Sequence, residues 1–239
     1  LPKDEIYHLL EQEHPADIAD IIEDLSQEDA LLFIDCIPGD LIADVISELE
    51  PSVREDLINE MDVRLLAYIL HEVPSDDAVD IFSELEDNEK KLEILKKLPN
   101  EDSLWLQELI LHKEDTAGGI MAKEIVSLPA EVSVDKAIEF IRRMKDEIED
   151  LYNIFVISKD RKLIGYVNLV ELVTSDPGRK LGEIMNENVI SVYSDTDQEE
   201  VANIARKYDL VSIPVVDKEG RLEGRITIDD IMDVMEEEQ

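Results

Sequence analysis

The sequence contains little cysteine and few basic residues for its length. Its 239 residues include 1 cysteine, and 23 Lys and Arg stand against 60 Asp and Glu. A single cysteine, Cys36, excludes an internal disulfide, and we interpret it as a small residue at the edge of a core in a reducing compartment. The formal net charge of −37 excludes binding to DNA, RNA or anionic lipid, and it predicts an attraction for cations.

Long apolar runs are missing as well. A membrane-spanning helix needs about 20 consecutive apolar residues, and no stretch of this chain approaches that length. No signal peptide is visible. The chain starts at Leu1 rather than at Met and ends in the acidic stretch Asp229–Gln239. We therefore expect it to be a part of a longer protein.

Patterns typical of enzymes are also missing. With 8 glycines, the chain has no glycine-rich phosphate-binding loop, and no Ser–His–Asp or Cys–His arrangement suggests a nucleophile. The four histidines lack the paired spacing of metal ligands, so we interpret them as structural or surface residues. They are His8, His14, His71 and His112. We expect no enzymatic activity.

The first 112 residues repeat an apolar pattern every twelve residues. Further apolar residues precede each repeating anchor by three, four and seven positions, which is the spacing of one helix face. The anchors are Leu25, Ile37, Leu49, Met61, Val73 and Leu85. Prolines and capping residues between them limit each helix to about two or three turns, too short to be stable alone. The pattern predicts a superhelical array of stacked short helices, broken only by Arg54.

Acidic residues concentrate in this helical region, which carries 31 Asp and Glu against 7 Lys and Arg. Several lie four residues apart on one helix face, such as Asp40 with Asp44 and Asp76 with Asp80, where like charges repel by a few tenths of a kcal/mol. A solvated surface and the preference of acids for helix N-termini explain any single pair. For the whole set, with so few lysines, a surface that binds divalent cations is the better interpretation.

Residues 113–239 contain two copies of one module. The stretch 151–172 repeats at 210–231 with an offset of 59 residues, and the stretch that begins at Gly118 repeats from Gly182 with an offset of 64. Each copy predicts a strand, a helix, a hairpin of two strands and a final helix, with the first helices at Val134–Met144 and Asp197–Tyr208. Because each copy is too small to be comfortably stable alone, we expect the two to pack as a pair.

The second copy carries the run Gly224-Arg225-Ile226-Thr227 followed by Asp230. In this feature the modules resemble CBS domains. The acidic helical repeats, the junction 114–121 and the stretch 195–201 extend the resemblance, because together they resemble the cytosolic part of MgtE-type magnesium transporters over essentially the whole chain. This resemblance implies a multidomain α plus α/β fold, with an N-terminal superhelical array of short helices followed by two CBS (β-α-β-β-α) modules packed as a pair.

The expected organisation has four parts. An acidic helical N domain occupies residues 1–112, the first CBS domain with its lead-in 113–182, and the second CBS domain 183–235. Residues 236–239 would begin a helix that connects to a transmembrane domain absent from this chain. The pair Gly118-Gly119, next to the charged residues Lys113–Asp115, is the expected hinge between the helical region and the modules.

The resemblance further implies a Mg²⁺-sensing regulatory domain at the cytoplasmic face of the cell membrane, a homodimer through its CBS domains, which closes on Mg²⁺ and shuts the pore. Asp76 and Asp80 would face Asp230 and Asp233, Glu199 and Asp209 would form a second cluster, and Asp44 and Glu238 are further candidates. Mg²⁺ suits such sites because it keeps several waters and bridges carboxylates without a dedicated cage. Two carboxylates about 6 Å apart repel by about 2–3 kcal/mol at an effective dielectric of about 20, so a cation would relieve this repulsion.

Other interpretations stay open. Asp230 stands in the first turn of a helix, where any acid is favourable, and Asp209 also fits a turn before a strand. CBS modules often hold AMP or ATP, and Thr227 and Asp230 would then bind ribose. Against this, the first copy has Asn168 and Glu171 at the matching positions, and no basic cluster serves phosphates. A helical-repeat scaffold for a partner protein would need an exposed apolar groove, whereas the apolar faces are used in stacking.

Overall fold

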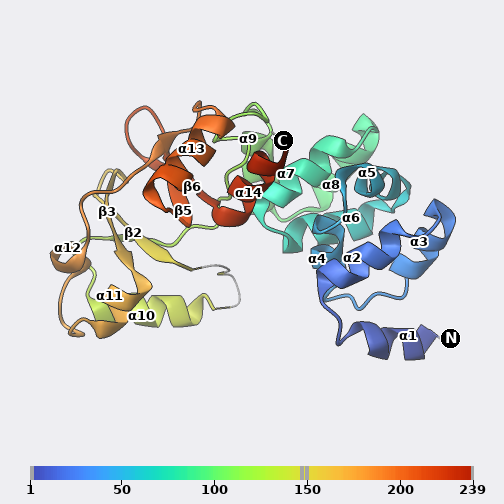
Figure 1. The fold of residues 1–239 in the computed structure, drawn as a ribbon, viewed down its shortest axis with the longest axis horizontal. Helices are drawn as coiled ribbons and strands as arrows, with labels where there is room; N and C mark the ends of the chain where they lie inside the picture. The colour runs from blue at the N-terminus through green and yellow to red at the C-terminus, as the bar shows by residue number, and fades with distance from the viewer. Residues whose placement is uncertain (1–2, 146–147, 149–150, 238–239) are drawn as a thin grey trace. The chain divides into compact units, whose positions relative to one another are not determined.

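The computed structural model describes residues 3–145, 148 and 151–237. The chain divides into two compact units, Leu1–Ile110 and Leu111–Gln239. Figure 1 shows the order of their elements. Among the described residues, no helix is both long enough and apolar enough to span a bilayer.

The first unit consists of short helices. They are α1 (Lys3–Leu10), α2 (Pro15–Glu23), α3 (Gln27–Ile34), α4 (Ile42–Ser47), α5 (Pro51–Glu60), α6 (Val63–Glu72), α7 (Ser75–Glu84), α8 (Asn88–Lys97) and α9 (Asn100–Leu109). Capping residues set their starts: the Asp62 carboxylate accepts from the Arg64 N–H at 2.7 Å, and the Asp87 carboxylate accepts from the Glu89 N–H at 2.8 Å. The predicted array of short helices is confirmed.

The helices of the first unit stack in two rows. α2, α4, α6 and α8 pack one on the next, and α3, α5, α7 and α9 do the same. The twelve-residue repeat explains this arrangement, because each helix turns its apolar stripe toward its neighbours in both rows. The anchors Ile37, Leu49, Met61, Val73 and Leu85 are buried, whereas Leu25, at the start of the array, is 37% exposed.

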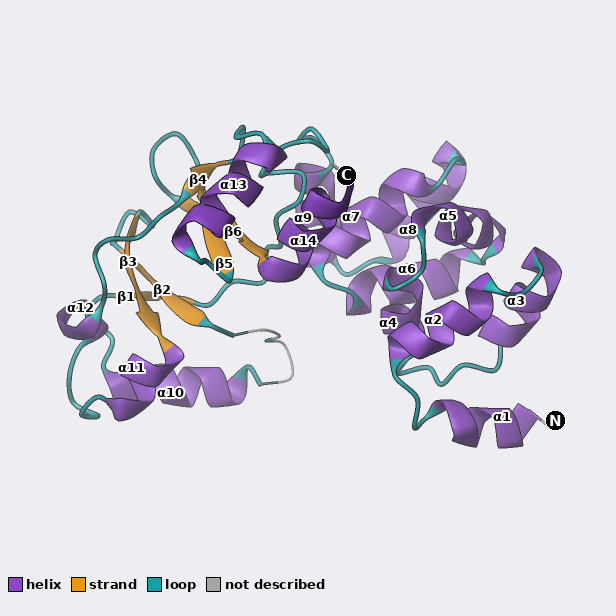
Figure 2. Ribbon diagram, in the orientation of Figure 1, coloured by secondary structure: helices purple, strands orange, loops and turns teal. Residues whose placement is uncertain are grey.

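The second unit contains the two predicted modules. The first has β1 (Ser127–Pro129), α10 (Val134–Arg143), β2 (Asn153–Ile157), β3 (Leu163–Asn168) and α11 (Leu169–Thr174). After α12 (Leu181–Ile184), the second has β4 (Val192–Tyr193), α13 (Gln198–Tyr208), β5 (Ser212–Val216), β6 (Leu222–Thr227) and α14 (Ile228–Glu237). Two sheets form, in the orders β1-β2-β3 and β4-β5-β6, and each joins a parallel pair to an antiparallel hairpin (Figure 2).

The two modules match residue by residue. β2 and β5, like β3 and β6, start 59 residues apart. The hairpin irregularity between Val156 and Ile157 recurs between Val215 and Val216. These coincidences confirm the internal repeat that the sequence predicted.

Each module also takes a backbone segment from the lead-in of the other. Ala122, ahead of the first module, pairs with Arg225 on β6, and Asn186, ahead of the second, pairs with Tyr166 on β3. The partner strands carry a glycine where the exchanged segment crosses. A Cβ on Gly224 would lie 2.6 Å from the Ala122 carbonyl oxygen, and one on Gly165 would lie 2.8 Å from that of Asn186. The glycine of the CBS motif is therefore needed for close approach of the other module, which confirms that the modules fold as a pair.

The junction between the units differs from the expected hinge. The Ala117 N–H donates to the Thr196 carbonyl at 2.7 Å, and the Gly118 N–H donates to that of Ser194 at 2.9 Å. A Cβ on Gly118 would lie 2.4 Å from the His112 ring. Gly118 and Gly119 are thus packed inside the second unit, and the division between the units falls earlier, between Ile110 and Leu111.

Candidate functional site

Asp230 lies in the first turn of α14, directly after β6. Its Oδ2 accepts hydrogen bonds from the Thr227 N–H and from the Thr227 hydroxyl, both at 2.8 Å. Burial raises the pKa of the Asp230 carboxyl to about 6, the hydrogen bonds from Thr227 oppose this rise, and repulsion from Asp229 and Asp233 adds to it. A carboxylate held here at neutral pH is costly, so an approaching cation would be favoured.

Ser212 stands opposite Thr227 in the β5–β6 ladder, and the two side chains therefore share one face of the sheet. The Ser212 hydroxyl is buried and has no hydrogen-bond partner among the described residues, and the same holds for Oε2 of Glu223, which lies on β6. Buried polar atoms in folded proteins are nearly always satisfied, so a pair of orphans on one strand pair indicates a place for a polar ligand or water. Sequence reasoning missed Ser212, although a serine at the start of an otherwise apolar strand was the available signal.

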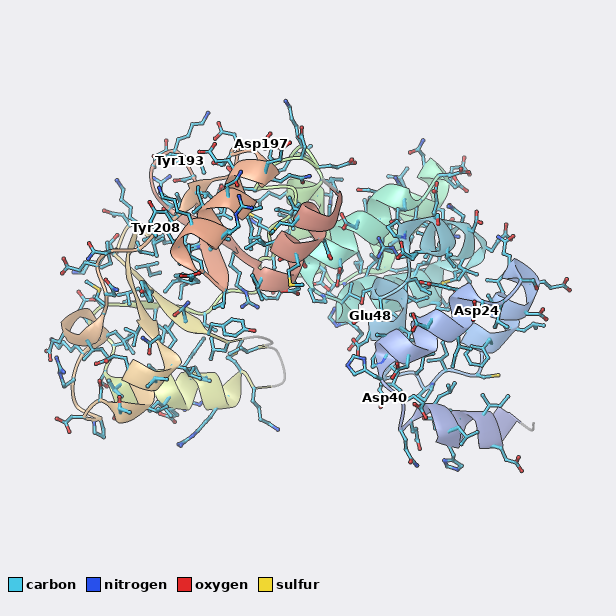
Figure 3. The ribbon with its side chains drawn as sticks, viewed as in Figure 1. Asp24, Asp40, Glu48, Tyr193, Asp197 and Tyr208 are labelled. Atoms are coloured by element: carbon cyan, nitrogen blue, oxygen red, sulfur yellow. The ribbon has the colours of Figure 1, made fainter. Side chains whose placement is uncertain are left out.

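Glu199 and Asp209 lie at opposite ends of α13. Glu199 is in the first turn, where its N–H donates to the Asp197 carboxylate at 3.0 Å. Asp209 ends the helix in the left-handed conformation, with φ 53°, and its N–H donates to the Ala205 carbonyl. Figure 3 labels Asp197, which caps the start of this helix, and Tyr208, its last residue. Ten residues of helix separate the two acids by about 15 Å, so one chain does not bring them to a single ion, and the second cluster stays a prediction that requires another chain.

Asp44, on α4, has acidic neighbours from a second helix. Partial burial raises the pKa of the Asp44 carboxyl, and repulsion from Glu72 and then from Asp40 raises it further. Glu72 ends α6, which packs on α4. Sequence reasoning found Asp40 through its helical spacing and missed Glu72, because 28 positions separate it from Asp44. Figure 3 shows the side chain of Asp40 on this unit.

Asp76 and Asp80 lie on α7. Asp76 is half-buried and its Oδ1 accepts from the Asp77 N–H at 3.1 Å, while Asp80 is exposed one turn later. The predicted site joins these residues of the first unit to Asp230 and Asp233 of the second, so it stays a prediction. Glu238 lies outside the described residues.

The donor set fits a hard cation. Carboxylate oxygens make up the candidate groups, and these are the ligands that Mg²⁺ prefers. Within the described parts of the chain, no three His, Cys, Asp or Glu side chains converge into a group that could hold a metal ion.

Comparison with known families and structures shows which family the chain belongs to. The family described as the MgtE intracellular N domain matches residues 13–115, and the CBS domain family matches residues 117–177 and 181–237. A crystal structure of the cytosolic domain of the Mg²⁺ channel MgtE in complex with ATP is similar with a TM-score of 0.90 and 33% identity, over 95% of this chain and 92% of that one. The chain belongs to the MgtE family.

Other MgtE relatives agree. A crystal structure of the soluble part of a magnesium transporter is similar with a TM-score of 0.89 and 31% identity, over 99% of this chain and 93% of that one. The magnesium transporter MgtE of Thermus thermophilus is 41% identical over 133 residues, and that of Enterococcus faecalis 36% over 139. These matches cover 56% and 58% of this chain but 30% and 31% of the two MgtE proteins. The family and fold class that the sequence predicted are confirmed.

Proposed function

We propose that this chain is the Mg²⁺-sensing regulatory region of a magnesium transporter, at the cytoplasmic face of the membrane. The observation that carries the proposal is electrostatic: in both units, carboxyl groups are held where burial and neighbouring acids raise their pKa, Asp44 in the first and Asp230 in the second. Such carboxylates are relieved by a divalent cation, and the relatives are magnesium transporters.

The proposed mechanism is closure driven by the ion. Mg²⁺ bridges Asp76 and Asp80 to Asp230 and Asp233, which brings the two units together. Without the ion, repulsion between these carboxylates opposes the contact. Because Asp230 lies in the first turn of α14, closure would fix the helix that leads toward the pore, and rising internal Mg²⁺ would shut the pore.

Thermal unfolding in MgCl₂ tests the binding of the ion. A ligand at a hundred times its Kd stabilises by about 2.7 kcal/mol, so the melting temperature should rise steeply with MgCl₂ and far less with NaCl of equal ionic strength. The double variant Asp76→Asn/Asp80→Asn should lose most of the rise. A matched control, Asp20→Asn/Asp24→Asn, removes the same charge from another helix face of the first unit. Equal rises in the two salts would overturn the proposal.

A distance measurement tests closure itself. Spin labels at Asn100, in the first unit, and Lys218, in the second, would report the separation of the units. We expect a narrower and shorter distance distribution in excess Mg²⁺ than in EDTA. An identical distribution in the two conditions would show that the chain does not sense the ion by closing.

A second candidate function is the binding of an adenine nucleotide to the second CBS module. The buried, unsatisfied Ser212 hydroxyl beside Thr227 favours it, and a similar structure, the cytosolic domain of the Mg²⁺ channel MgtE, was crystallised in complex with ATP. ATP should then raise the melting temperature without Mg²⁺, Ser212→Ala should remove the effect, and the equivalent change in the first module, Asn153→Ala, should not. A response to ATP that survives Ser212→Ala would place the nucleotide elsewhere.

A further inference from the structure

Arg54 is the one charged residue at an apolar position of the twelve-residue repeat, and the structure shows which groups its guanidinium contacts. The side chain is buried, at 6% exposure. Its Nε donates to both oxygens of Glu84, at 2.9 and 3.2 Å, and its Nη2 donates to Oε1 of Glu84 at 2.7 Å. Nη1 donates to the Ser47 carbonyl oxygen at 3.1 Å. The guanidinium thus joins α5 to the last turn of α7 and to the end of α4.

Glu84 is the C-terminal member of an acidic stripe on α7. Asp77 and Asp80 precede it by seven and four residues, so the three carboxylates lie on one side of the helix. Burial lowers the pKa of Arg54, but the hydrogen bonds and charge of Glu84, with the charges of Asp80 and Asp77, raise it overall. Arg54 is therefore a permanent cation within the electrostatic reach of the same stripe that carries the proposed ligand Asp80.

We propose that Glu84 is a positioning residue that holds the guanidinium of Arg54 at the C-terminal end of the stripe and so keeps it from competing with the divalent cation at Asp80. The inference rests on the proposed Mg²⁺ function. Arginine is a strong competitor because its planar fork binds carboxylates bidentately. A tethered competitor also acts at a high effective concentration. Once Glu84 loses its charge, Asp80 and Asp77 remain as the acids of α7 whose charges act on the guanidinium.

Mg²⁺ titration of four forms of the intact chain tests this inference. The forms are the wild type, Glu84→Gln, Arg54→Met/Glu84→Gln, and the control Glu86→Gln, which removes an exposed charge two residues beyond α7. Methionine replaces arginine at similar length, and exchange of a buried ion pair for apolar groups is often neutral for stability. Melting temperatures in EDTA report the fold separately from calorimetric Mg²⁺ affinity.

We expect Glu84→Gln to weaken Mg²⁺ binding by about threefold to tenfold, the effect of one partly screened charge contact. Removal of the competitor in the double variant should restore the affinity to about the wild-type value, even though it changes the core further. Glu86→Gln should bind as the wild type does. A purely structural role predicts the opposite order, with the double variant at least as weak as Glu84→Gln, and that result would overturn the inference.

The Arg54 side chain provides a readout that needs no Mg²⁺. In the wild type in EDTA, its Nε–H should give a protected NMR resonance, which moves in Glu84→Gln and moves again when Asp80→Asn is added. A resonance unchanged by Glu84→Gln would overturn the inference while leaving the proposed function intact. A wild type that fails to bind Mg²⁺ while the resonance moves as expected would overturn the proposed function and not the exchange of partners by Arg54.

Discussion

The two CBS modules have the same backbone but begin their last helices with opposite hydrogen bonds. In the first module, the Asn168 side chain reaches forward and accepts from the Glu171 N–H at 2.7 Å. In the second, the Asp230 side chain reaches back and accepts from the Thr227 N–H at 2.8 Å. These are the two halves of a capping box, divided between the modules. The forward cap leaves Glu171 exposed, whereas the backward cap draws Asp230 into a half-buried position where its pKa rises.

The two modules thus share one fold but differ in how the polar groups at the start of the last helix are satisfied. In the first module the polar side chain satisfies the helix start and the acid stays in water. In the second module, the Asp230 carboxylate itself accepts the hydrogen bond from the Thr227 N–H at the helix start. The pKa of this carboxyl therefore depends on its burial beside β6. Ser212, buried and unsatisfied, lies on the same face and matches Asn153 in the first module. Ligand sensitivity is therefore expected in the second module.

The largest effect should come from the glycines that let the modules interlock. Gly224→Ala would place a Cβ 2.6 Å from the Ala122 carbonyl oxygen, and Gly165→Ala would place one 2.8 Å from that of Asn186. Backbone atoms cannot yield cheaply, so we expect each change to destabilise by about 2–4 kcal/mol in urea unfolding. Gly178→Ala, where a Cβ would meet nothing within 4 Å, is the control. If the first two variants unfold like the control, the exchanged segments do not hold the pair together.

The second prediction concerns the homodimer expected through the CBS modules. On α11 of the first module, Val170 and Val173 are 71% and 64% exposed, whereas the matching positions on α14 are Asp229 and Met232. Because exposed apolar patches often mark protein–protein contacts, we expect this pair to lie in the contact between the two chains of the dimer. Val170→Asp/Val173→Asp should convert a dimer at micromolar concentration to a 27.3 kDa monomer in sedimentation, while Asp229→Asn should not. A double variant that still sediments as a dimer would place the interface elsewhere.

The third prediction uses the pKa of Asp230. The carboxyl has a pKa of about 6 in the folded chain against 3.8 ordinarily, so the native state binds the proton more tightly than the unfolded state. Stability in EDTA should fall as pH rises from about 4 to about 6 and stay level above that. Asp230→Asn should remove the fall and stabilise by about 2 kcal/mol at neutral pH, after allowance for solvent screening. Glu171→Gln in the first module should change the free energy of unfolding little. An equal gain in stability from both variants would mean that burial does not distinguish Asp230 from Glu171.

Sequence periodicity predicted the elements because it is a local property. The twelve-residue repeat gave the helices of the first unit, and the offsets of 59 and 64 gave the strands and helices of the modules. The family resemblance supplied the candidate acids, which neither periodicity nor spacing could rank. What the sequence could not provide was the direction of a side chain at a helix start, which decides that Asp230 is half-buried and Glu171 is not.

Contacts between distant helices were also beyond the sequence. Glu72 approaches Asp44, and Glu84 meets Arg54 across 30 positions, because helices two apart in order pack in one row. The break at Arg54 was visible as an anomaly, but its partner depended on the stacking geometry. Likewise, Gly118-Gly119 suggested a hinge because glycine permits bending, whereas here it permits close packing against His112.

The smallest expected effect compares the two hairpin turns. Arg161 in the first module and Gly220 in the second are equivalent and both left-handed, with φ of 61° and 79°. A Cβ on Gly220 would meet nothing within 4 Å, so the cost of Gly220→Ala should come from the backbone alone and be about 1 kcal/mol. Arg161→Gly should do the reverse and stabilise by about 0.5 kcal/mol, because relief of the left-handed backbone is partly offset by a more flexible unfolded chain. Urea unfolding of both variants measures the difference. Stability changes of the same sign in the two variants would show that the two turns, although both left-handed, are held by different neighbours.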